Sequence, residues 1–172
     1  MTSVAVAVRY LTFDGTEAVG TLEVHPRLVG PVRALFDALL DRGFPLARVA
    51  TYAESKQLPK DEQWRTTIGW RPSKAVGSDR PSHHSAGLAI DLNPHLNPYV
   101  SPAVTLPPGA VYDPSLPGTV TPDVVAVFKA HGFLWGGDWH TKKDYMHFSW
   151  ADSAALAGLP PETPGPLRLG PA

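Results

Sequence analysis

Large apolar side chains at every second position predict two strands near the start of the chain. Residues 4–8 and 20–24 have this pattern, and Asp14-Gly15 lies between them as a turn. Residues 31–42 instead repeat apolar side chains at helical spacing, with Pro31 suited to the first turn and Gly43 expected to end the helix. The predicted buried stripe of this helix is Val32, Leu35, Phe36, Leu39 and Leu40.

The rest of the chain alternates short elements with long irregular segments. We expect strands at residues 48–52, 87–93 and 145–150, and a helix that begins at Thr121 as N-cap and ends before Gly132. Two long loops separate them, the polar residues 53–82 and the proline-rich residues 94–118, and loops of that length in a compact domain are functional or disordered. The pattern predicts an α+β fold, with a small, mainly antiparallel sheet and helices on one side.

One domain is expected over residues 1–152, followed by a tail at 153–172. The tail contains five prolines, which block helix and strand pairing, so we expect an extended, weakly packed segment.

Composition excludes several kinds of site. The net charge of −1 lacks the basic excess of nucleic-acid-binding proteins, so no nucleic-acid partner is expected. Because the chain has seven histidines and no cysteine, any metal must be held by His, Asp or Glu. The chain has no run of 18 apolar residues, so no membrane span is predicted. No signal peptide is expected at the start, so an extracytoplasmic protein would need another export route.

A first group of chemically competent residues lies between Ser82 and Asp91. In a strand, Gly87, Ala89 and Asp91 would share one face, whose small side chains leave room beside a carboxylate. His84 precedes the strand and can fold over the same face, where imidazole and carboxylate suit zinc. The alternative is a surface turn with two histidines and a capping Asp, and His83 competes with His84 for the ligand position.

A second group surrounds His147, which lies in an aromatic segment where a lone histidine is more often part of the core. Asp144, three residues earlier, could take a proton from a metal-bound water if it lies in a turn before the strand. Otherwise it is a solvated turn residue paired with Lys142 or Lys143. The Gly136-Gly137 pair is compatible with either a cleft wall or a tight turn, and His131 is interpreted as structural.

Together these motifs resemble the M15 family of zinc peptidases, in particular its VanY-like D-alanyl-D-alanine carboxypeptidases and the related L-alanyl-D-glutamate endopeptidases. The resemblance covers residues 5–152. It rests on Ser82-x-His84-x-x-Gly87-x-Ala89-x-Asp91, on Asn93-Pro94 with Asn97-Pro98-Tyr99, on the Gly132–Trp139 segment and on Asp144-x-x-His147.

The resemblance implies a Hedgehog/DD-peptidase-like fold, with Zn²⁺ held by His84, Asp91 and His147. It further implies Asp144 as general base, where Glu is the more frequent residue, Arg71 as the group that polarises the scissile carbonyl, and Ser82 as a substrate contact. Segment 54–62 departs from the family pattern, and it is expected to line the substrate cleft.

The expected function is zinc-dependent hydrolysis of peptidoglycan stem peptides, as a D-Ala-D-Ala carboxypeptidase that acts on the bacterial cell wall as a monomer. Three alternatives remain open. One is a phage-type endolysin with L-Ala-D-Glu endopeptidase activity, cytoplasmic until released. The second is a non-catalytic zinc-containing domain that binds the wall, and the third is a zinc hydrolase that acts on other amides or esters.

Overall fold

The first layer of the molecule is a β-hairpin. The computed structural model describes residues 3–75 and 78–164. Strands β1 (Val4–Leu11) and β2 (Glu17–Val24) pair antiparallel along their whole length, so both are longer than predicted. The predicted turn is confirmed: the Asp14 carboxylate accepts a hydrogen bond from the Thr16 backbone N–H at 3.0 Å, and Gly15 has a φ of +84°.

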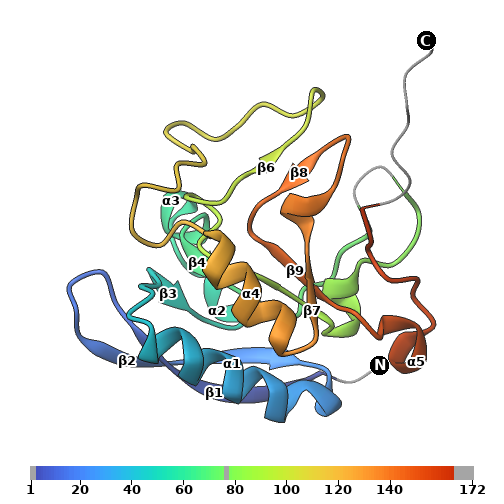
Figure 1. The fold of residues 1–172 in the computed structure, drawn as a ribbon, viewed down its shortest axis with the longest axis horizontal. Helices are drawn as coiled ribbons and strands as arrows, with labels where there is room; N and C mark the ends of the chain where they lie inside the picture. The colour runs from blue at the N-terminus through green and yellow to red at the C-terminus, as the bar shows by residue number, and fades with distance from the viewer. Residues whose placement is uncertain (1–2, 76–77, 165–172) are drawn as a thin grey trace.

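Two helices cover the hairpin and the main sheet. Helix α1 (Val29–Asp41) packs on β1 and contacts α4 (Pro122–Ala130), which in turn packs on strand β7 (Phe133–Trp135) (Figure 1). Both helices were predicted, and both end as expected, with Gly43 and Gly132 at positive φ just beyond them. The predicted stripe of α1 is buried, apart from the half-buried Leu40.

The main sheet is antiparallel, with the strand order β5 (Ala89–Asp91), β9 (His147–Trp150) and β7 (Phe133–Trp135). Its inner face meets the hairpin and helices in one core. The core includes Val6, Leu22, Leu35, Phe36, Leu88, Ile90, Phe128, Phe133 and Phe148. The fold is α+β with small, mainly antiparallel sheets, as the sequence predicts.

The strand predicted at residues 87–93 is shorter than expected, because Gly87 ends a 3₁₀ helix instead of beginning the strand. The 3₁₀ helix η2 (His83–Ala86) precedes β5 and ends at Gly87, whose φ is +68°. A Cβ on Gly87 would lie 2.5 Å from the backbone nitrogen of His25, so the end of β2 approaches this glycine. The interpretation of Gly87 as open space beside a carboxylate was therefore wrong.

Residues 48–82 contain more structure than predicted. Strand β3 is only Arg48–Val49 and pairs in parallel with β4 (Thr66–Thr67). The predicted strand ends early because Thr51 caps helix α2 (Tyr52–Ser55), and Glu54 bonds back to the Thr51 backbone N–H at 2.8 Å. Helix α3 (Lys60–Gln63) follows.

The long loop after β5 is held at its base by Asn93. The Asn93 side chain bonds the backbone of Pro45, Ala47 and Gly118, at 2.9, 3.1 and 3.0 Å. Strand β6 (Tyr99–Val100) pairs with β8 (Lys143–Asp144) beyond it.

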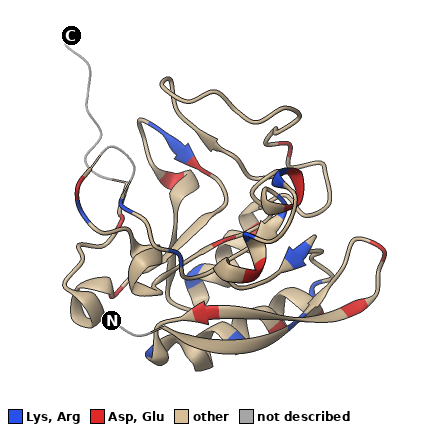
Figure 2. Cartoon of the chain, turned by 180° about the vertical axis from the view of Figure 1, so that it is seen from behind, with Lys and Arg blue, Asp and Glu red and all other residues tan. Residues whose placement is uncertain are grey.

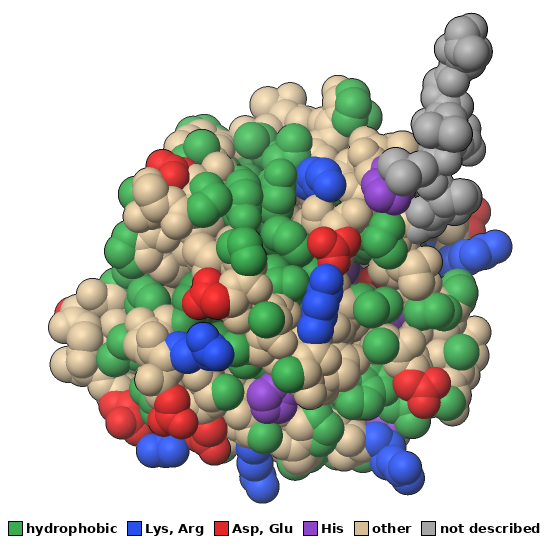
Figure 3. Space-filling model, in the orientation of Figure 1, with side chains coloured by type: hydrophobic (Ala, Val, Ile, Leu, Met, Phe, Trp, Pro, Cys, Tyr) green, Lys and Arg blue, Asp and Glu red, His purple; other side chains and the backbone are tan. Residues whose placement is uncertain are grey.

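The outer part of the loop is rich in apolar side chains. Tyr112 stacks on Tyr145 with ring centroids 3.7 Å apart, which attaches the loop to the turn before β9. Figure 3 shows hydrophobic side chains gathered on this face between the loop and β8.

The tail begins with a helix that the sequence did not predict. Helix α5 (Ser153–Ala157) ends at Gly158, whose φ is +65°, and the apolar side chains of Leu156 and Leu159 pack against the core. From Leu159 to Pro164 the chain has no regular secondary structure, as proline predicts.

Charged residues of both signs are interspersed over the described chain (Figure 2). None of the helices in the described ranges is long and apolar enough to cross a membrane.

Candidate metal centre

Three buried side chains from separate segments converge on one point. His84 lies on η2, Asp91 ends β5 and His147 begins β9. The antiparallel register places Asp91 directly opposite His147, so their side chains leave the sheet on the same face. His84 Nε2 is 3.0 Å from Asp91 Oδ1, His147 Nδ1 is 3.2 Å from the same oxygen, and the two nitrogens are 3.2 Å apart.

This arrangement fits a zinc ion. Tetrahedral zinc with ligand bonds of about 2.0–2.1 Å requires ligand atoms about 3.3 Å apart, close to the separations observed here. Two imidazole nitrogens and a carboxylate oxygen are typical zinc donors, and these three residues can hold a metal ion. His83 is not part of the group, so the structure places His84 rather than its neighbour at this position.

Each histidine has a hydrogen-bond partner on the ring nitrogen that faces away from the group. His84 Nδ1 donates to the Gly69 carbonyl at 2.7 Å, which leaves Nε2 free as a donor to metal. His147 Nε2 lies 2.6 Å from Glu162 Oε2, so Nδ1 is the ring nitrogen that faces Asp91 and His84. Burial lowers the pKa of His84, whereas hydrogen bonds to Asp91 and Glu162 outweigh burial and raise the pKa of His147 well above its usual value.

Glu162 is the site residue that sequence reasoning missed. Its second carboxylate oxygen lies 3.3 Å from His83 Nδ1, and its backbone carbonyl accepts a hydrogen bond from Trp139 Nε1 at 3.2 Å. Burial raises its pKa, but the hydrogen bonds to His147 and His83 prevail, so the pKa lies below the usual value. The one available signal was that Glu162 is the single acidic residue in the proline-rich tail.

Asp144 is half-buried near the group. It lies in β8 opposite Tyr99, not in a turn as predicted, and Tyr145-Met146 then turn the chain into β9. Its Oδ1 is buried without a hydrogen-bond partner among the described residues. Burial, reinforced by the charges of Asp91 and Glu162, outweighs the opposing charges of His147 and Arg71 and raises the pKa of Asp144 to about 7.

The predicted lysine partners of Asp144 lie elsewhere. Lys143 Nζ donates to the Gly137 carbonyl at 2.9 Å, and Lys142 Nζ lies 5.2 Å from the centre of the Trp139 ring. Neither forms an ion pair with Asp144 in residues 3–75 and 78–164. The interpretation of Asp144 as a turn residue paired with lysine is therefore not supported.

The Gly136-Gly137 pair allows close packing beneath the site. Both residues lie in the 3₁₀ helix η3 (Gly136–Asp138), and a Cβ on Gly136 would be 2.6 Å from the Asp144 carbonyl oxygen and 3.3 Å from the His147 Cβ. A Cβ on Gly137 would overlap the Trp135 ring at 2.3 Å. His131 is the C-cap of α4, and its Nδ1 donates to the Val127 carbonyl at 2.8 Å.

Arg71 and Ser82 both reach the edge of the group. Arg71 Nη2 lies 3.4 Å from Asp91 Oδ2, and its side chain is 36% exposed, so donors remain free for another ligand. The Ser82 hydroxyl accepts a hydrogen bond from the His84 backbone N–H at 3.2 Å and so caps η2. Both residues line a small pocket of about 70 Å³ beside His84 and His147.

A larger cleft of about 390 Å³ opens on the other side of Arg71 and Asp144. Ser55, Lys56 and Lys60 line it, which confirms that segment 54–62 contributes to the cleft. The cleft is also lined by three aromatic side chains, Tyr52, Trp64 and Tyr99, and by three charged ones, Arg71, Asp91 and Asp144.

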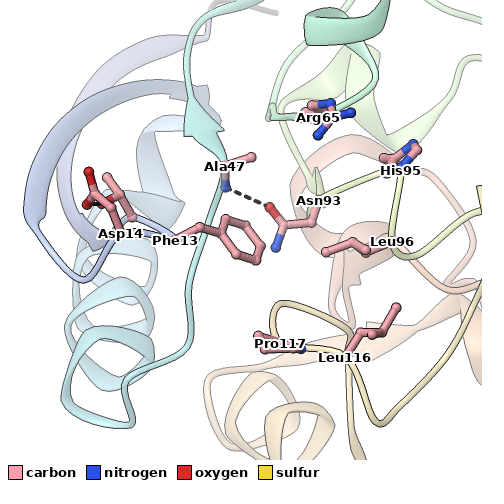
Figure 4. Close-up of a pocket in the computed structure, with 10 residues that line it drawn as sticks. Phe13, Asp14, Ala47, Arg65, Asn93, His95, Leu96, Leu116 and Pro117 are labelled. Atoms are coloured by element: carbon pink, nitrogen blue, oxygen red, sulfur yellow. Dashed lines mark hydrogen bonds between the residues drawn. The ribbon is translucent and has the colours of Figure 1, made fainter.

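A cavity of about 600 Å³ lies away from these residues, between the hairpin turn and the base of the long loop (Figure 4). Phe13, Leu96 and Leu116 give it an apolar lining, and Arg65 and His95 point toward it from one side. It contains none of the three converging residues, so chemistry rather than size identifies the candidate site.

Comparison with known proteins agrees with this geometry. A family profile of the M15 peptidases, described as D-alanyl-D-alanine carboxypeptidase, matches residues 76–150, the stretch that contains Ser82, His84, Asp91, Asp144 and His147. The chain is 31% identical over 134 residues to the peptidoglycan L-alanyl-D-glutamate endopeptidase CwlK of Bacillus subtilis (strain 168), covering 73% of this chain and 72% of that protein. The α+β architecture is the Hedgehog/DD-peptidase-like fold of such enzymes. This chain belongs to the M15 family of peptidases.

Proposed function

We propose that this protein is a zinc-dependent peptidase that hydrolyses peptidoglycan stem peptides, with His84, Asp91 and His147 as the zinc ligands. The observation that carries the proposal is the Asp144 carboxylate beside a His-Asp-His group at the edge of a cleft, because its buried Oδ1 has no hydrogen-bond partner in the part of the chain that the structure describes. A structural ion pair would have satisfied that oxygen, whereas a general base needs it free for a proton. Family membership and the relative CwlK, which is a peptidoglycan endopeptidase, support the substrate class.

A zinc ion at this position would acidify a bound water and polarise the substrate carbonyl. Asp144 would accept the proton of the attacking water and then pass it to the leaving amine. Its raised pKa suits both steps, because a carboxyl with a pKa near neutrality can take up a proton and release it again.

Arg71 is proposed to stabilise the negative charge that develops on the carbonyl oxygen. Its guanidinium contacts Asp91 through a single long interaction of 3.4 Å and is partly exposed in the cleft, so other N–H groups can reach a substrate. Ser82 is proposed as a weaker substrate contact, since its hydroxyl can donate a hydrogen bond while it accepts one from η2.

We propose the terminal D-Ala-D-Ala bond as the scissile bond. The small pocket beside the zinc ligands is too confined for a long peptide, and Arg71, Lys74 and Lys142 line it. Lys74 is already paired with Asp79 at 2.9 Å and Arg71 is assigned to the carbonyl oxygen, so Lys142 is the side chain suited to hold a free C-terminal carboxylate.

L-Ala-D-Glu endopeptidase activity is the second candidate, because CwlK is an enzyme of that kind. An endopeptidase would place peptide on both sides of Asp144, and the cleft of about 390 Å³ offers space on one of them. The two activities give different products from the same substrate.

Mass spectrometry of muropeptides after digestion tests the proposal. Zinc-loaded protein should release D-alanine from pentapeptide stems, chelation should abolish the release and added zinc should restore it. Cleavage after L-Ala would identify the endopeptidase instead. Full activity in metal-free protein would overturn the zinc mechanism, and absence of any hydrolysis by zinc-loaded protein would favour a wall-binding domain.

A further inference from the structure

The tail returns to the candidate metal centre and places a carboxylate against it. Glu162 Oε2 lies 2.6 Å from His147 Nε2, and Glu162 Oε1 lies 3.3 Å from His83 Nδ1. The side chain is 24% exposed, and it lines the small pocket together with the proposed zinc ligands His84 and His147. Both carboxylate oxygens are therefore engaged with histidines on one side of the site.

We propose that Glu162 is a positioning residue of the metal centre, which holds the His147 ring with Nδ1 directed at His84 and Asp91. The inference rests on the proposed function, since it requires these residues to bind zinc. Glu162 does not ligate the metal in this scheme, because it contacts the nitrogen on the far side of the ring.

The two nitrogens of an imidazole ring have different roles at a metal site. A neutral histidine carries one proton, and the nitrogen that keeps it cannot ligate a metal. An acceptor at Nε2 fixes the proton there and leaves the Nδ1 lone pair free. Glu162 supplies that acceptor for His147, as the Gly69 carbonyl does at the opposite nitrogen of His84.

A carboxylate that accepts the His147 Nε2 proton has an effect that a neutral carbonyl lacks. Its negative charge makes the imidazole a stronger electron donor to the metal. With both histidines neutral, Asp91 and Glu162 together supply two negative charges beside the donor atoms, which balances a divalent cation in a buried site.

The rest of the tail fixes Glu162 in place. Trp139 Nε1 donates to the Glu162 backbone carbonyl at 3.2 Å, and Ser153 Oγ donates to the Leu159 carbonyl at 3.0 Å. Because Leu159 also packs against the core, only a few residues separate an anchored position from Glu162. The prolines restrict the backbone of that connection, so little conformational entropy is lost when the Glu162 carboxylate is held against His147.

Zinc affinity of the full-length protein tests the inference. Glu162→Ala should bind zinc about 10–100-fold more weakly than the wild type in competition with a chromophoric chelator. Glu162→Gln should fall between them, because the amide oxygen still accepts the His147 proton but carries no charge. Thr163→Ala, an exposed neighbour in the same tail, should retain wild-type affinity and serves as the matched control.

The cobalt-substituted protein supplies a spectroscopic signature. The visible absorption bands of bound Co²⁺ should change in Glu162→Ala and stay closer to wild type in Glu162→Gln. A Glu162→Ala protein with a lower unfolding temperature but unchanged zinc affinity and cobalt spectrum would overturn the inference and reduce Glu162 to a tail anchor. His147→Ala separates the two proposals: if it loses zinc while Glu162→Ala does not, the proposed function stands without the inference. A wild type that binds no zinc would remove both.

Discussion

Two aspartates at the site have pKa values displaced in opposite directions. Burial raises the pKa of both, but His84 and His147 outweigh that effect at Asp91 and hold its pKa well below the usual range. At Asp144 burial outweighs the opposing charge of His147 and raises the pKa to about 7. The environment thus separates a carboxylate that stays ionised from one that can exchange protons near neutral pH.

The first prediction concerns the role of Asp144. Asp144→Ala should lower kcat by about 10²–10⁴-fold, the usual contribution of a general base, while zinc content stays at the wild-type level. Zinc content by atomic absorption and turnover of a pentapeptide check this. His147→Ala should lose both, and equal zinc loss in the two variants would contradict the base assignment.

The second prediction uses the pH dependence of stability in metal-free protein. Because the folded pKa of Asp144 lies above the usual 3.8, the folded state pays an increasing penalty for ionisation as pH rises from about 4 to about 7. Asp144→Asn removes the charge, so its stability relative to wild type should increase over that range and be constant above it. We expect at least about 1 kcal/mol at pH 8, or roughly 2–4 °C in unfolding temperature. A stability difference that does not change between pH 4 and pH 8 would contradict the raised pKa.

The sequence predicts some of these residues and not others. Strand parity predicts the face from which Asp91 projects, and the spacing allows His84 to fold over that face, although His84 itself lies on the 3₁₀ helix η2. The role of His147 required a family resemblance, since a histidine among aromatic residues has no distinguishing local signal. Glu162 was not predictable, because its contact with His147 depends on how the tail folds back.

At the level of elements, prediction succeeded where the apolar pattern repeats over many residues. Helix α1 and the β1–β2 hairpin each repeat their pattern over many residues, so packing and propensity agree. It failed at residues 50–55, where the apolar character of a strand competes with a capping box. The capping box prevails because Thr51 and Glu54 satisfy backbone groups locally, without a partner strand.

The third prediction concerns the contact of η3 with β8 and β9. Gly136→Ala should destabilise the protein by about 1–3 kcal/mol and weaken zinc binding, because its Cβ would overlap backbone that carries Asp144. Gly30→Ala in α1 is the matched control: nothing lies within 4 Å of its added Cβ, so it should stabilise by about 0.5–1 kcal/mol. Urea denaturation measures both, and comparable effects of the two substitutions would contradict the packing argument.

At the scale of the whole molecule, the candidate metal centre is formed by segments that lie far apart in the sequence. The α+β class was predictable because it depends on the kinds of element present, whereas the cleft depends on how the segment at 54–62 and β6 close around Asp144. Those contacts are tertiary and leave no periodic trace in the sequence.

The fourth prediction follows from this convergence. A metal that binds His84, Asp91 and His147 binds only the folded state, so zinc at 100 times its Kd should add about 2.7 kcal/mol of stability. The unfolding temperature should rise by roughly 5–11 °C on zinc addition and fall again with chelator. Calorimetry checks this, with His147→Ala expected to show no shift, and an equal shift in that variant would place the zinc elsewhere.

The position of Glu162 has a practical consequence for where the protein can be cut. A recombinant version ending at residue 152, the domain limit predicted from the sequence, would retain every predicted site residue and the sheet that holds them. It would nevertheless lack the carboxylate that contacts His147, and an activity assay of that shortened protein would underestimate the enzyme. Expression boundaries and affinity tags are therefore best chosen to leave the chain through Pro164 intact.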